Sequence, residues 1–554
     1  MVIMTAKNNT VSSGYERIGI NEIVLQVPNL STTAADIVRA FHTRNKNISE
    51  NEREQLIAND IGKMTNGLGI KTVRIPGYSE SNITFVANTI YEFCKKVLSN
   101  SEDMAKLEAE PIRSIYYGSE SNSDRSRPEV ESSLLLVYSK LLEEDQIKHR
   151  KIVEMLKRSA LVPITYACAG GGIGLVDAVA KVKFSIDAGM SQSSLVITAD
   201  TSIYDHRRAP NAEFTQGAGA VLLWITSNPR IASIMYEKDN GNYHMPLSDF
   251  TKFGADTPLV HGKFSERVFV YTVAKALETL ERYGNGISLK EIEFFVTHVP
   301  FPKQSIYFAS FLFAHQLKTY QKGLFDEIQK RGDVGAEPLP NGGRITDLMD
   351  SKFAAFNNGN GNPMSEEDII GYIEKDAEIE AYWNWLKNLR NQKEFDLFIE
   401  RTHIKSALIY PSEIGNSYSS SAFVAFTSLL KNTPELFDGK PRMGVLAFYG
   451  SGALAKSIVV EVCATSEILS RNISVTLHDT KHIGSEQYEQ LHSNLLEGDA
   501  ARTIGKGDLI EKDKEFLSLE VLPRGFHIKH RNPNGTGEYC YSDGSKMTPL
   551  RIRY

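Results

Sequence analysis

Cys168 lies in a sequence setting that suits a nucleophile. It follows an apolar segment, residues 161–167, and precedes three glycines and a helix-like stretch at 173–188. The glycines allow the backbone to turn sharply, and the positive end of the helix dipole then favours the thiolate form of the sulfur. The alternative is a small buried cysteine in a packing turn, because most free cysteines behave as hydrophobic residues. Other segments must decide between these interpretations.

Two more polar side chains follow predicted strands. His298 comes directly after a predicted strand at 292–297, and Asn416 follows a predicted strand at 406–410 and opens another predicted helix. Positions where buried strands open into a cleft are common binding sites in α/β proteins. The alternatives are a hydrogen-bonded core histidine and a helix cap. Lys303, five residues after His298, is ordinarily a solvated side chain.

Glu120 and the turn around Ser451 complete the set. Glu120 stands just beyond a predicted strand at 112–117, although glutamates in such places are normally exposed. Ser451 lies between two glycines after a predicted strand at 443–448, so backbone N–H groups there could bind an oxyanion. Gly-Ser-Gly turns are otherwise commonplace. The recurrence of such strand ends is the reason to consider the five segments together.

Short apolar strands alternate with amphipathic helices in the first half of the sequence. This pattern is typical of an α/β fold. The predicted strands are 112–117, 164–167, 195–199 and 219–226, and the predicted helices include 129–143 and 176–184.

The scheme restarts near residue 260 and predicts a second, similar half. The predicted helices are 268–283 and one from residue 305, and the predicted strands are 292–297, 406–410 and 443–448. Between about 320 and 402 the pattern loosens into a Gly/Asn-rich stretch and a charged helical segment, which we interpret as an insertion. A solvated or oligomer-facing excursion is favoured there over an active-site lid. Beyond about 470 we expect a packed C-terminal extension.

Composition limits the class of protein. The 554 residues are 41% hydrophobic and 23% charged, which is typical of globular chains with more than one domain-sized unit. The net charge of -6 argues against a nucleic-acid partner or an anionic membrane. Four scattered cysteines predict neither a metal site nor a disulfide framework. Without a secretory signal or a membrane-length apolar run, we expect a cytoplasmic protein.

Taken in order, these motifs resemble those of the 3-hydroxy-3-methylglutaryl-coenzyme A (HMG-CoA) synthases, a family of thiolase-like condensing enzymes. The similarity covers roughly residues 15–470. The segments that match the glutamate, nucleophile and histidine motifs are 118–120, 167–171 and 297–303, and further matches are 415–418, 449–452, 67–70, 199–201, 243–245 and 248–250.

The resemblance implies a thiolase-like fold, in which two similar α/β halves are layered α-β-α-β-α. The N-terminal half would be 15–226 and the C-terminal half 227–470, followed by an extension at 471–554. The insertion at about 320–402 is atypical of the family.

The resemblance also implies an activity. Cys168 would be acetylated by acetyl-CoA, Glu120 would remove a proton from the acetyl methyl group, and His298 would polarise the ketone of acetoacetyl-CoA. The product would be HMG-CoA of the mevalonate pathway to isoprenoids, formed by a homodimer without metal or further cofactor. The substrate-binding residues implied are Asn416, Ser451, Thr215, Asp200, Asp249, His244 and Lys303.

This sequence departs from the family in three places. Ala169 stands where members usually carry an aromatic residue, the stretch 206–215 differs from the usual turn, and the insertion is long. Two rival functions stay open. One is a condensing enzyme that acts on carrier-protein thioesters, for β-branching or as a ketoacyl synthase. The other is a non-catalytic thiolase-fold subunit, which the retained reactive residues disfavour.

Overall fold

Strands from both halves of the chain are hydrogen-bonded into one continuous sheet. In this computed structural model, which describes residues 17–44, 47–122, 127–205, 209, 212–236, 241–252, 257–284, 287–339, 343–357, 366–477, 480–500, 508–531 and 537–552, the order is β12-β13-β14-β8-β1-β7-β6-β4-β5. The strands are β1 (Ile18–Gln26), β4 (Ile112–Gly118), β5 (Ala160–Ile164), β6 (Ser193–Asp200), β7 (Gly219–Ser227), β8 (Ala232–Ile234), β12 (Phe294–Thr297), β13 (Arg442–Gly450) and β14 (Leu454–Val462). Because β8 pairs with both β1 and β14, it joins the two runs of strands.

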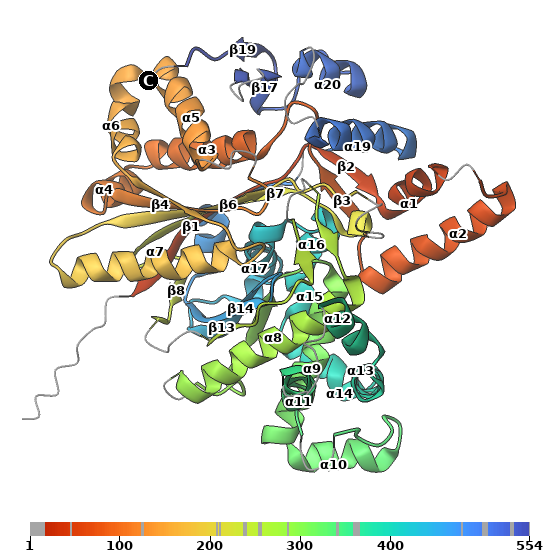
Figure 1. The fold of residues 1–554 in the computed structure, drawn as a ribbon. Helices are drawn as coiled ribbons and strands as arrows, with labels where there is room; N and C mark the ends of the chain where they lie inside the picture. The colour runs from red at the N-terminus through yellow and green to blue at the C-terminus, as the bar shows by residue number, and fades with distance from the viewer. Residues whose placement is uncertain are drawn as a thin grey trace, which may run out of the picture.

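Helices cover both outer faces of the strands and fill the space between them (Figure 1). The outer helices of the first half are α3 (Asn82–Ser99) and α5 (Val130–Glu144). The central helices are α7 (Gly170–Asp187) and α17 (Ser421–Asn432), and the far side is covered by α8 (Gly262–Tyr283) and α9 (Pro302–Tyr320). The predicted α/β class and the α-β-α-β-α layering are confirmed.

Helix α17 is buried on all sides, because strands lie above and below it, whereas α7 is fully buried only near its start and exposes residues such as Phe184. Every residue of α17 from 421 to 430 is buried. A helix that is buried all round needs small or apolar residues on every face, rather than a single apolar stripe. At the start of α7 the small residues are glycines. A Cβ on Gly171 would lie 2.7 Å from the carbonyl oxygen of Ser419, which is too close for a side chain. The predicted role of these glycines in a sharp turn is therefore wrong, since they allow close helix packing instead.

Two predicted strands differ from the structure. The segment predicted as a strand at 164–167 begins at the last residue of β5, which ends at Ile164, and the chain then turns toward Cys168. The segment 406–410 is helical, within α15 (Ile404–Ala407) and α16 (Ile409–Ile414). A short buried apolar run cannot be assigned to strand or helix by periodicity alone. Pro411 lies in the first turn of α16, where its missing N–H has no cost.

The insertion is packed against the protein on one side, so a fully solvated excursion is wrong, while the oligomer-facing alternative stays a prediction. It contains α10 (Lys322–Arg331), α11 (Ile345–Asn357), α12 (Glu366–Lys375), α13 (Ala377–Leu389) and α14 (Lys393–Arg401), while residues 358–365 lie outside the described chain. Ile379, Tyr382 and Leu386 of α13 are buried in the core that α8 and α9 also form. The buried Arg267 of α8 donates hydrogen bonds to the carbonyl oxygen of Ile373 and to Glu380.

The C-terminal extension is packed, as predicted. It contributes α18 (Ser466–Asn472), β15 (Ile473–Thr476), β16 (Lys481–His482), α19 (Ser485–Ala500), α20 (Leu509–Leu517), β17 (Gly525–Arg531), β18 (Gly537–Ser542) and β19 (Met547–Pro549). Strand β15 pairs in parallel with β1, and α19 packs on α1 (Ala34–Thr43). Tyr488 and Leu491 of α19 are fully buried.

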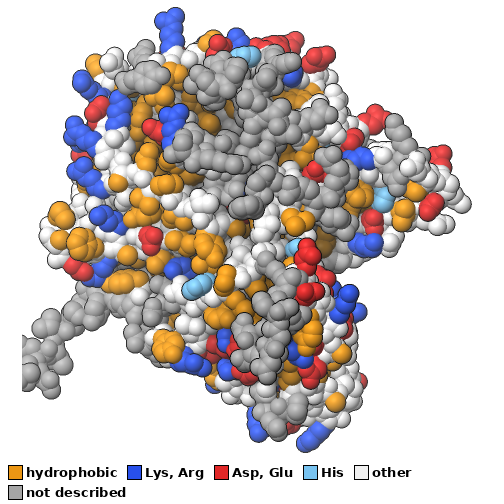
Figure 2. All heavy atoms as spheres, viewed as in Figure 1, with side chains coloured by type: hydrophobic (Ala, Val, Ile, Leu, Met, Phe, Trp, Pro, Cys, Tyr) orange, Lys and Arg blue, Asp and Glu red, His pale blue; other side chains and the backbone are white. Residues whose placement is uncertain are grey.

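The surface carries charges of both signs. Acidic and basic side chains are interspersed over the face that Figure 2 shows. Within the described ranges, no helix has both the length and the apolar character needed to cross a membrane.

The close approach of α7 to β13 gives a test of the packing. A Cβ on Gly172 would lie 2.4 Å from Cγ of Phe448, so Gly172→Ala is expected to lower the free energy of unfolding by about 1–3 kcal/mol. Gly371→Ala in α12, where a Cβ would meet nothing within 4 Å, is the matched control and should stabilise by about 0.5–1 kcal/mol. Urea unfolding measures both. Equal effects of the two substitutions would contradict the packing described.

Candidate active site

The Cys168 thiol donates a hydrogen bond to Glu120. Its Sγ lies 2.8 Å from Oε2 of Glu120, and the cysteine is 7% exposed. Ala167, between the end of β5 and Cys168, adopts φ of 38°, a conformation that non-glycine residues rarely occupy. This turn directs the sulfur toward the end of β4, which Glu120 follows. Two residues that the sequence placed 48 positions apart are thus in direct contact.

Asp200 fixes the Glu120 loop. Its Oδ1 accepts hydrogen bonds from the amides of Glu120 (2.8 Å) and Ser121 (3.0 Å) and from the hydroxyls of Ser119 (3.0 Å) and Ser121 (2.7 Å). Its Oδ2 accepts from the amide (2.9 Å) and the hydroxyl of Ser419, just before α17. Asp200 is fully buried, and both of its oxygens are occupied by protein donors. The structure therefore gives it a positioning role at the end of β6, whereas the resemblance implied contact with substrate.

Burial and like charge set the protonation of this pair. Burial, with a contribution from Asp200, raises the pKa of Glu120 to about 7, while Lys252 opposes the rise. Burial and the neighbouring Glu120 raise the pKa of the Cys168 thiol well above its usual value. Burial and the charge of Glu120 thus oppose the helix dipole, which by itself favours the thiolate. The resting pair is a thiol beside a carboxylate that can accept its proton.

Two tyrosines and a lysine that the sequence did not single out surround the pair. Tyr204 and Tyr418 pack with Cys168 in one small buried cluster. Burial raises the pKa of both phenols, so each stays neutral. Nζ of Lys252 lies 3.4 Å from the carbonyl oxygen of Glu120, which holds a positive charge at the rim. Lys252 lies three residues after Asp249, and this closeness to the 248–250 motif was the available signal.

His298 is a neutral, fixed imidazole at the end of β12. Its Nδ1 lies 2.8 Å from Oγ of Ser421, and that oxygen also accepts the amide of Val299 at 2.6 Å. The hydroxyl proton is then available to Nδ1, so we assign the ring proton to Nε2. Burial lowers the pKa of His298 to about 3. The side chain thus offers a neutral N–H donor, and its ring stacks near that of Tyr449 at 6.4 Å between centroids.

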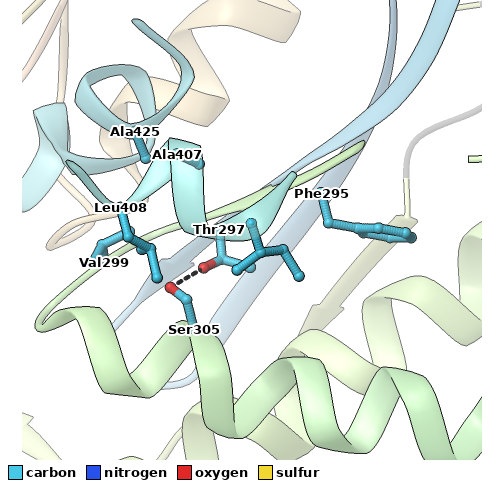
Figure 3. Close-up of a pocket in the computed structure, with 8 residues that line it drawn as sticks. Phe295, Thr297, Val299, Ser305, Ala407, Leu408 and Ala425 are labelled. Carbon is cyan, nitrogen blue, oxygen red and sulfur yellow. Dashed lines mark hydrogen bonds between the residues drawn. The ribbon is translucent and has the colours of Figure 1, made fainter. Parts of the chain in front are cut away.

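The strand behind His298 is well packed. Figure 3 shows Thr297 and Ser305 pointing toward each other, with their hydroxyl oxygens 2.7 Å apart. The cavity beside them has a volume of about 10 Å³, which holds one water at most. A substrate therefore has no room on this side of β12.

Asp249 fixes the hairpin between β13 and β14. It accepts hydrogen bonds from the hydroxyl of Tyr449 and the amide of Gly452, both at 2.7 Å. The Gly452 N–H is thus already paired, which corrects the expectation that this glycine offers a free oxyanion donor. Ser451 lies at the tip of the hairpin and is half-buried. Asp249 is buried and acts behind the hairpin.

Ala169 explains one departure from the family pattern. It is fully buried against the same hairpin, since a Cβ on Gly450 would lie 2.8 Å from Cβ of Ala169. An aromatic side chain at this position would collide with the hairpin. The contact also brings the Cys168 turn next to the end of β13.

Asn416 serves as a cap and also borders the site. Its Oδ1 accepts the amide of Tyr418 at 2.8 Å, so the cap that we considered as the alternative is present. Its backbone N–H donates to the carbonyl oxygen of Thr215 at 2.8 Å. The Thr215 hydroxyl donates to the carbonyl oxygen of Ala212, within its own turn. Residues 206–208 and 210–211 of the preceding stretch lie outside the described chain.

His244 and Lys303 lie on two different elements, β9 (Gly241–His244) and α9. His244 is exposed and pairs with Leu454, the first residue of β14. Lys303 is half-buried in the first turn of α9, with its Cγ 3.5 Å from where a Cβ on Gly69 would be. The described residues contain no group of three or more His, Cys, Asp or Glu side chains placed to hold a metal ion.

The shared proton predicts a distinctive pH profile for the sulfur. Because the carboxylate of Glu120 must accept the thiol proton, the rate of Cys168 alkylation is expected to rise as pH increases through about 7. Glu120→Gln should remove this limb and leave only the rise that belongs to an isolated buried thiol. Iodoacetamide labelling, quantified on the Cys168 peptide, measures both profiles. Identical profiles for the two proteins would show that Glu120 does not accept the proton.

Comparisons with known proteins agree on one family. No protein-family model matches the chain. The chain is 27% identical over 438 residues to the hydroxymethylglutaryl-CoA synthase of Haloferax volcanii, which covers 78% of this chain and 85% of that protein. It is 24% identical over 526 residues to the hydroxymethylglutaryl-CoA synthase of Saccharomyces cerevisiae, which covers 92% of this chain and 86% of the yeast protein.

Solved structures give the same result for the fold. MvaS in complex with 3-hydroxy-3-methylglutaryl coenzyme A matches with a TM-score of 0.57 at 18% identity, over 95% of this chain and 100% of that one. The curacin biosynthetic pathway HMG synthase in complex with acetyl donor-ACP matches with a TM-score of 0.57 at 15% identity, over 95% of this chain and 100% of that one. The chain is thus similar in sequence to hydroxymethylglutaryl-CoA synthases, and its fold is that of their solved structures.

Proposed function

We propose that this protein condenses acetyl-CoA with acetoacetyl-CoA and water to give 3-hydroxy-3-methylglutaryl-CoA and free CoA. The observation that carries the proposal is the 2.8 Å contact between the Cys168 thiol and Glu120. A nucleophile and a base in direct contact, in a buried site, are what a covalent acyl transfer needs.

In the first step Glu120 accepts the thiol proton while the sulfur attacks the carbonyl carbon of acetyl-CoA. The new C–S bond replaces the bond to CoA. The proton on Glu120 passes to the departing CoA thiolate, so free CoA leaves as a thiol. Cys168 then carries an acetyl group and Glu120 is again a carboxylate.

In the second step the same carboxylate removes a proton from the acetyl methyl group. A base positioned for this task contributes about 10²- to 10⁴-fold. The resulting carbanion attacks the ketone carbon of acetoacetyl-CoA, and the neutral Nε2–H of His298 donates a hydrogen bond to the ketone oxygen as charge develops there. The oxygen ends as a hydroxyl and takes the proton that Glu120 removed. Water then hydrolyses the thioester to Cys168. This releases HMG-CoA and returns a hydrogen to the Cys168 sulfur.

Asn416 supports the same chemistry. Because its Oδ1 caps the turn at Tyr418, its amide nitrogen is the part that remains to orient a thioester oxygen. Ser451 at the hairpin tip and the cationic Lys303 at the start of α9 fit contacts with the pantetheine arm and the phosphates of coenzyme A. We assign Thr215 and His244 to the outer rim of the substrate site.

The competing proposal is that the acyl groups arrive on a carrier protein. Glu120 disfavours chain-starting ketoacyl synthases, since their carbanion comes from decarboxylation and needs no such base. It does not distinguish free CoA thioesters from carrier-bound ones. The relatives at 27% and 24% identity are named as synthases of the CoA ester, which favours the free thioester. We place the reaction in the cytoplasm and in the mevalonate route to isoprenoids.

We also propose a homodimer. Strand β5 forms one edge of the large sheet, and its residues are exposed or half-buried, unlike those of β6. Exposed edge strands are usually covered by another element or chain. A second copy of this chain, paired along β5, would cover the edge next to each Cys168 turn.

The roles of Cys168 and Glu120 separate in two variants. Cys168→Ala is expected to lose both acetyl transfer and condensation, because no sulfur remains to carry the acetyl group. Glu120→Ala should still become acetylated, more slowly, yet fail to condense. Radiolabel from acetyl-CoA and release of free thiol in the presence of acetoacetyl-CoA measure the two steps.

Three results would count against this assignment. Label retained on Cys168→Ala would place the acetyl group elsewhere. Glu120→Ala with condensation intact would remove its role as the carbon base. Turnover of the unmodified enzyme with carrier-bound thioesters but not with free CoA thioesters would select the competing proposal.

A further inference from the structure

The C-terminal extension reaches the active-site wall through a buried polar cluster. Arg44, directly after α1, donates two hydrogen bonds to the carboxylate of Glu213, at 2.6 Å and 2.9 Å. It donates a third, at 2.7 Å, to Glu489 on α19. The side chain of Glu213 is fully buried. Further hydrogen bonds to its carboxylate are therefore needed to offset the cost of removing the ion pair from water.

Tyr488 of α19 links this ion pair to the next layer. Its hydroxyl donates to Oε1 of Glu213 at 2.9 Å and accepts from Nε2 of Gln216 at 2.9 Å. Oε1 of Gln216 accepts the backbone amide of Tyr204 at 3.2 Å. Tyr488 is fully buried and Gln216 is 4% exposed. Buried amide and hydroxyl groups that are fully paired allow one arrangement, because any other leaves an unpaired polar group.

Gln216 contacts two segments that lie next to the Cys168 thiol. Tyr204 packs with Cys168 and Tyr418 in the small buried cluster. The backbone of Gln216 pairs with that of Asn416, whose side chain caps the turn at Tyr418. Gln216 therefore contacts both the Tyr204 segment and the Asn416 turn, on their sides facing α19.

We propose that α19 is a positioning element of the active site, and that Tyr488, acting through Gln216, holds the Tyr204 segment and the Asn416 turn against the Cys168 thiol. Tyr488 touches no reacting atom, so it is a positioning residue. The inference concerns access to the thiol and goes beyond the proposed reaction, whatever thioester the enzyme accepts.

The test is the rate at which iodoacetamide alkylates Cys168 in the full-length protein, followed on the Cys168 peptide. Tyr488→Phe keeps the ring and removes the two hydrogen bonds of the hydroxyl. Alkylation is expected to speed up about fivefold, the factor that corresponds to the net contribution of one hydrogen bond, because only the bond with Gln216 leads to the thiol. Gln216→Leu, which cuts the path at its other end, should give a similar increase.

Asn494→Ala is the matched control. Its amide donates to the hydroxyl of Tyr78 from the exposed side of the same helix, away from Gln216. This variant should alkylate at the rate of the unmodified protein. Thermal unfolding of all variants shows whether each is folded at the temperature of the assay.

A double-mutant cycle decides whether Tyr488 acts through Gln216. If it does, the Tyr488→Phe/Gln216→Leu protein alkylates no faster than either single variant. Multiplied effects in the double variant, or equal rates for Tyr488→Phe and Asn494→Ala, would overturn the proposal. Neither result depends on condensation activity. The proposed reaction is tested separately, by turnover of the unmodified enzyme.

Discussion

One shared proton, held between the Cys168 sulfur and the Glu120 carboxylate, is the interaction on which the rest of the site depends. In water a thiol and a carboxylate hold their protons independently. Here burial raises the pKa of both groups, and the second negative charge is disfavoured by the first. The Cys168 side chain is therefore protonated before the reaction begins. The protein also keeps a carboxylate in contact with that thiol, as the proposed two-step reaction requires.

This arrangement requires that elements far apart in the sequence be fixed to within tenths of an ångström. Asp200 does much of this, because its two oxygens bind the Glu120 loop on one side and Ser419 before α17 on the other. The glycines of α7 allow the central helices to approach closely enough for these bonds to form. Asp249 does the same for the β13–β14 hairpin, through Tyr449 and Gly452. Of these three acids, Asp200 and Asp249 bind neighbouring loops, while Glu120 contacts the thiol.

Local patterns in the sequence predicted the α/β class and the strands that carry Glu120 and His298, since alternation and apolar runs report directly on burial. The order of the motifs predicted that Glu120 and Cys168 would meet. Local patterns could not predict which oxygens of Asp200 face protein donors, because those donors lie up to 219 residues away. For the same reason they could not predict the resting thiol, which depends on burial. The helical 406–410 and the packed insertion were missed because periodicity does not report tertiary partners.

The resting thiol is the most direct point of test. A difference infrared spectrum between the unmodified protein and Cys168→Ala isolates the S–H stretch of this one cysteine from those of the other three. Just above the pH of about 7 at which Glu120 ionises, the account predicts an S–H band shifted by a strong hydrogen bond, and a smaller shift in Glu120→Gln. Absence of the band at that pH would mean a resting thiolate and would contradict the account.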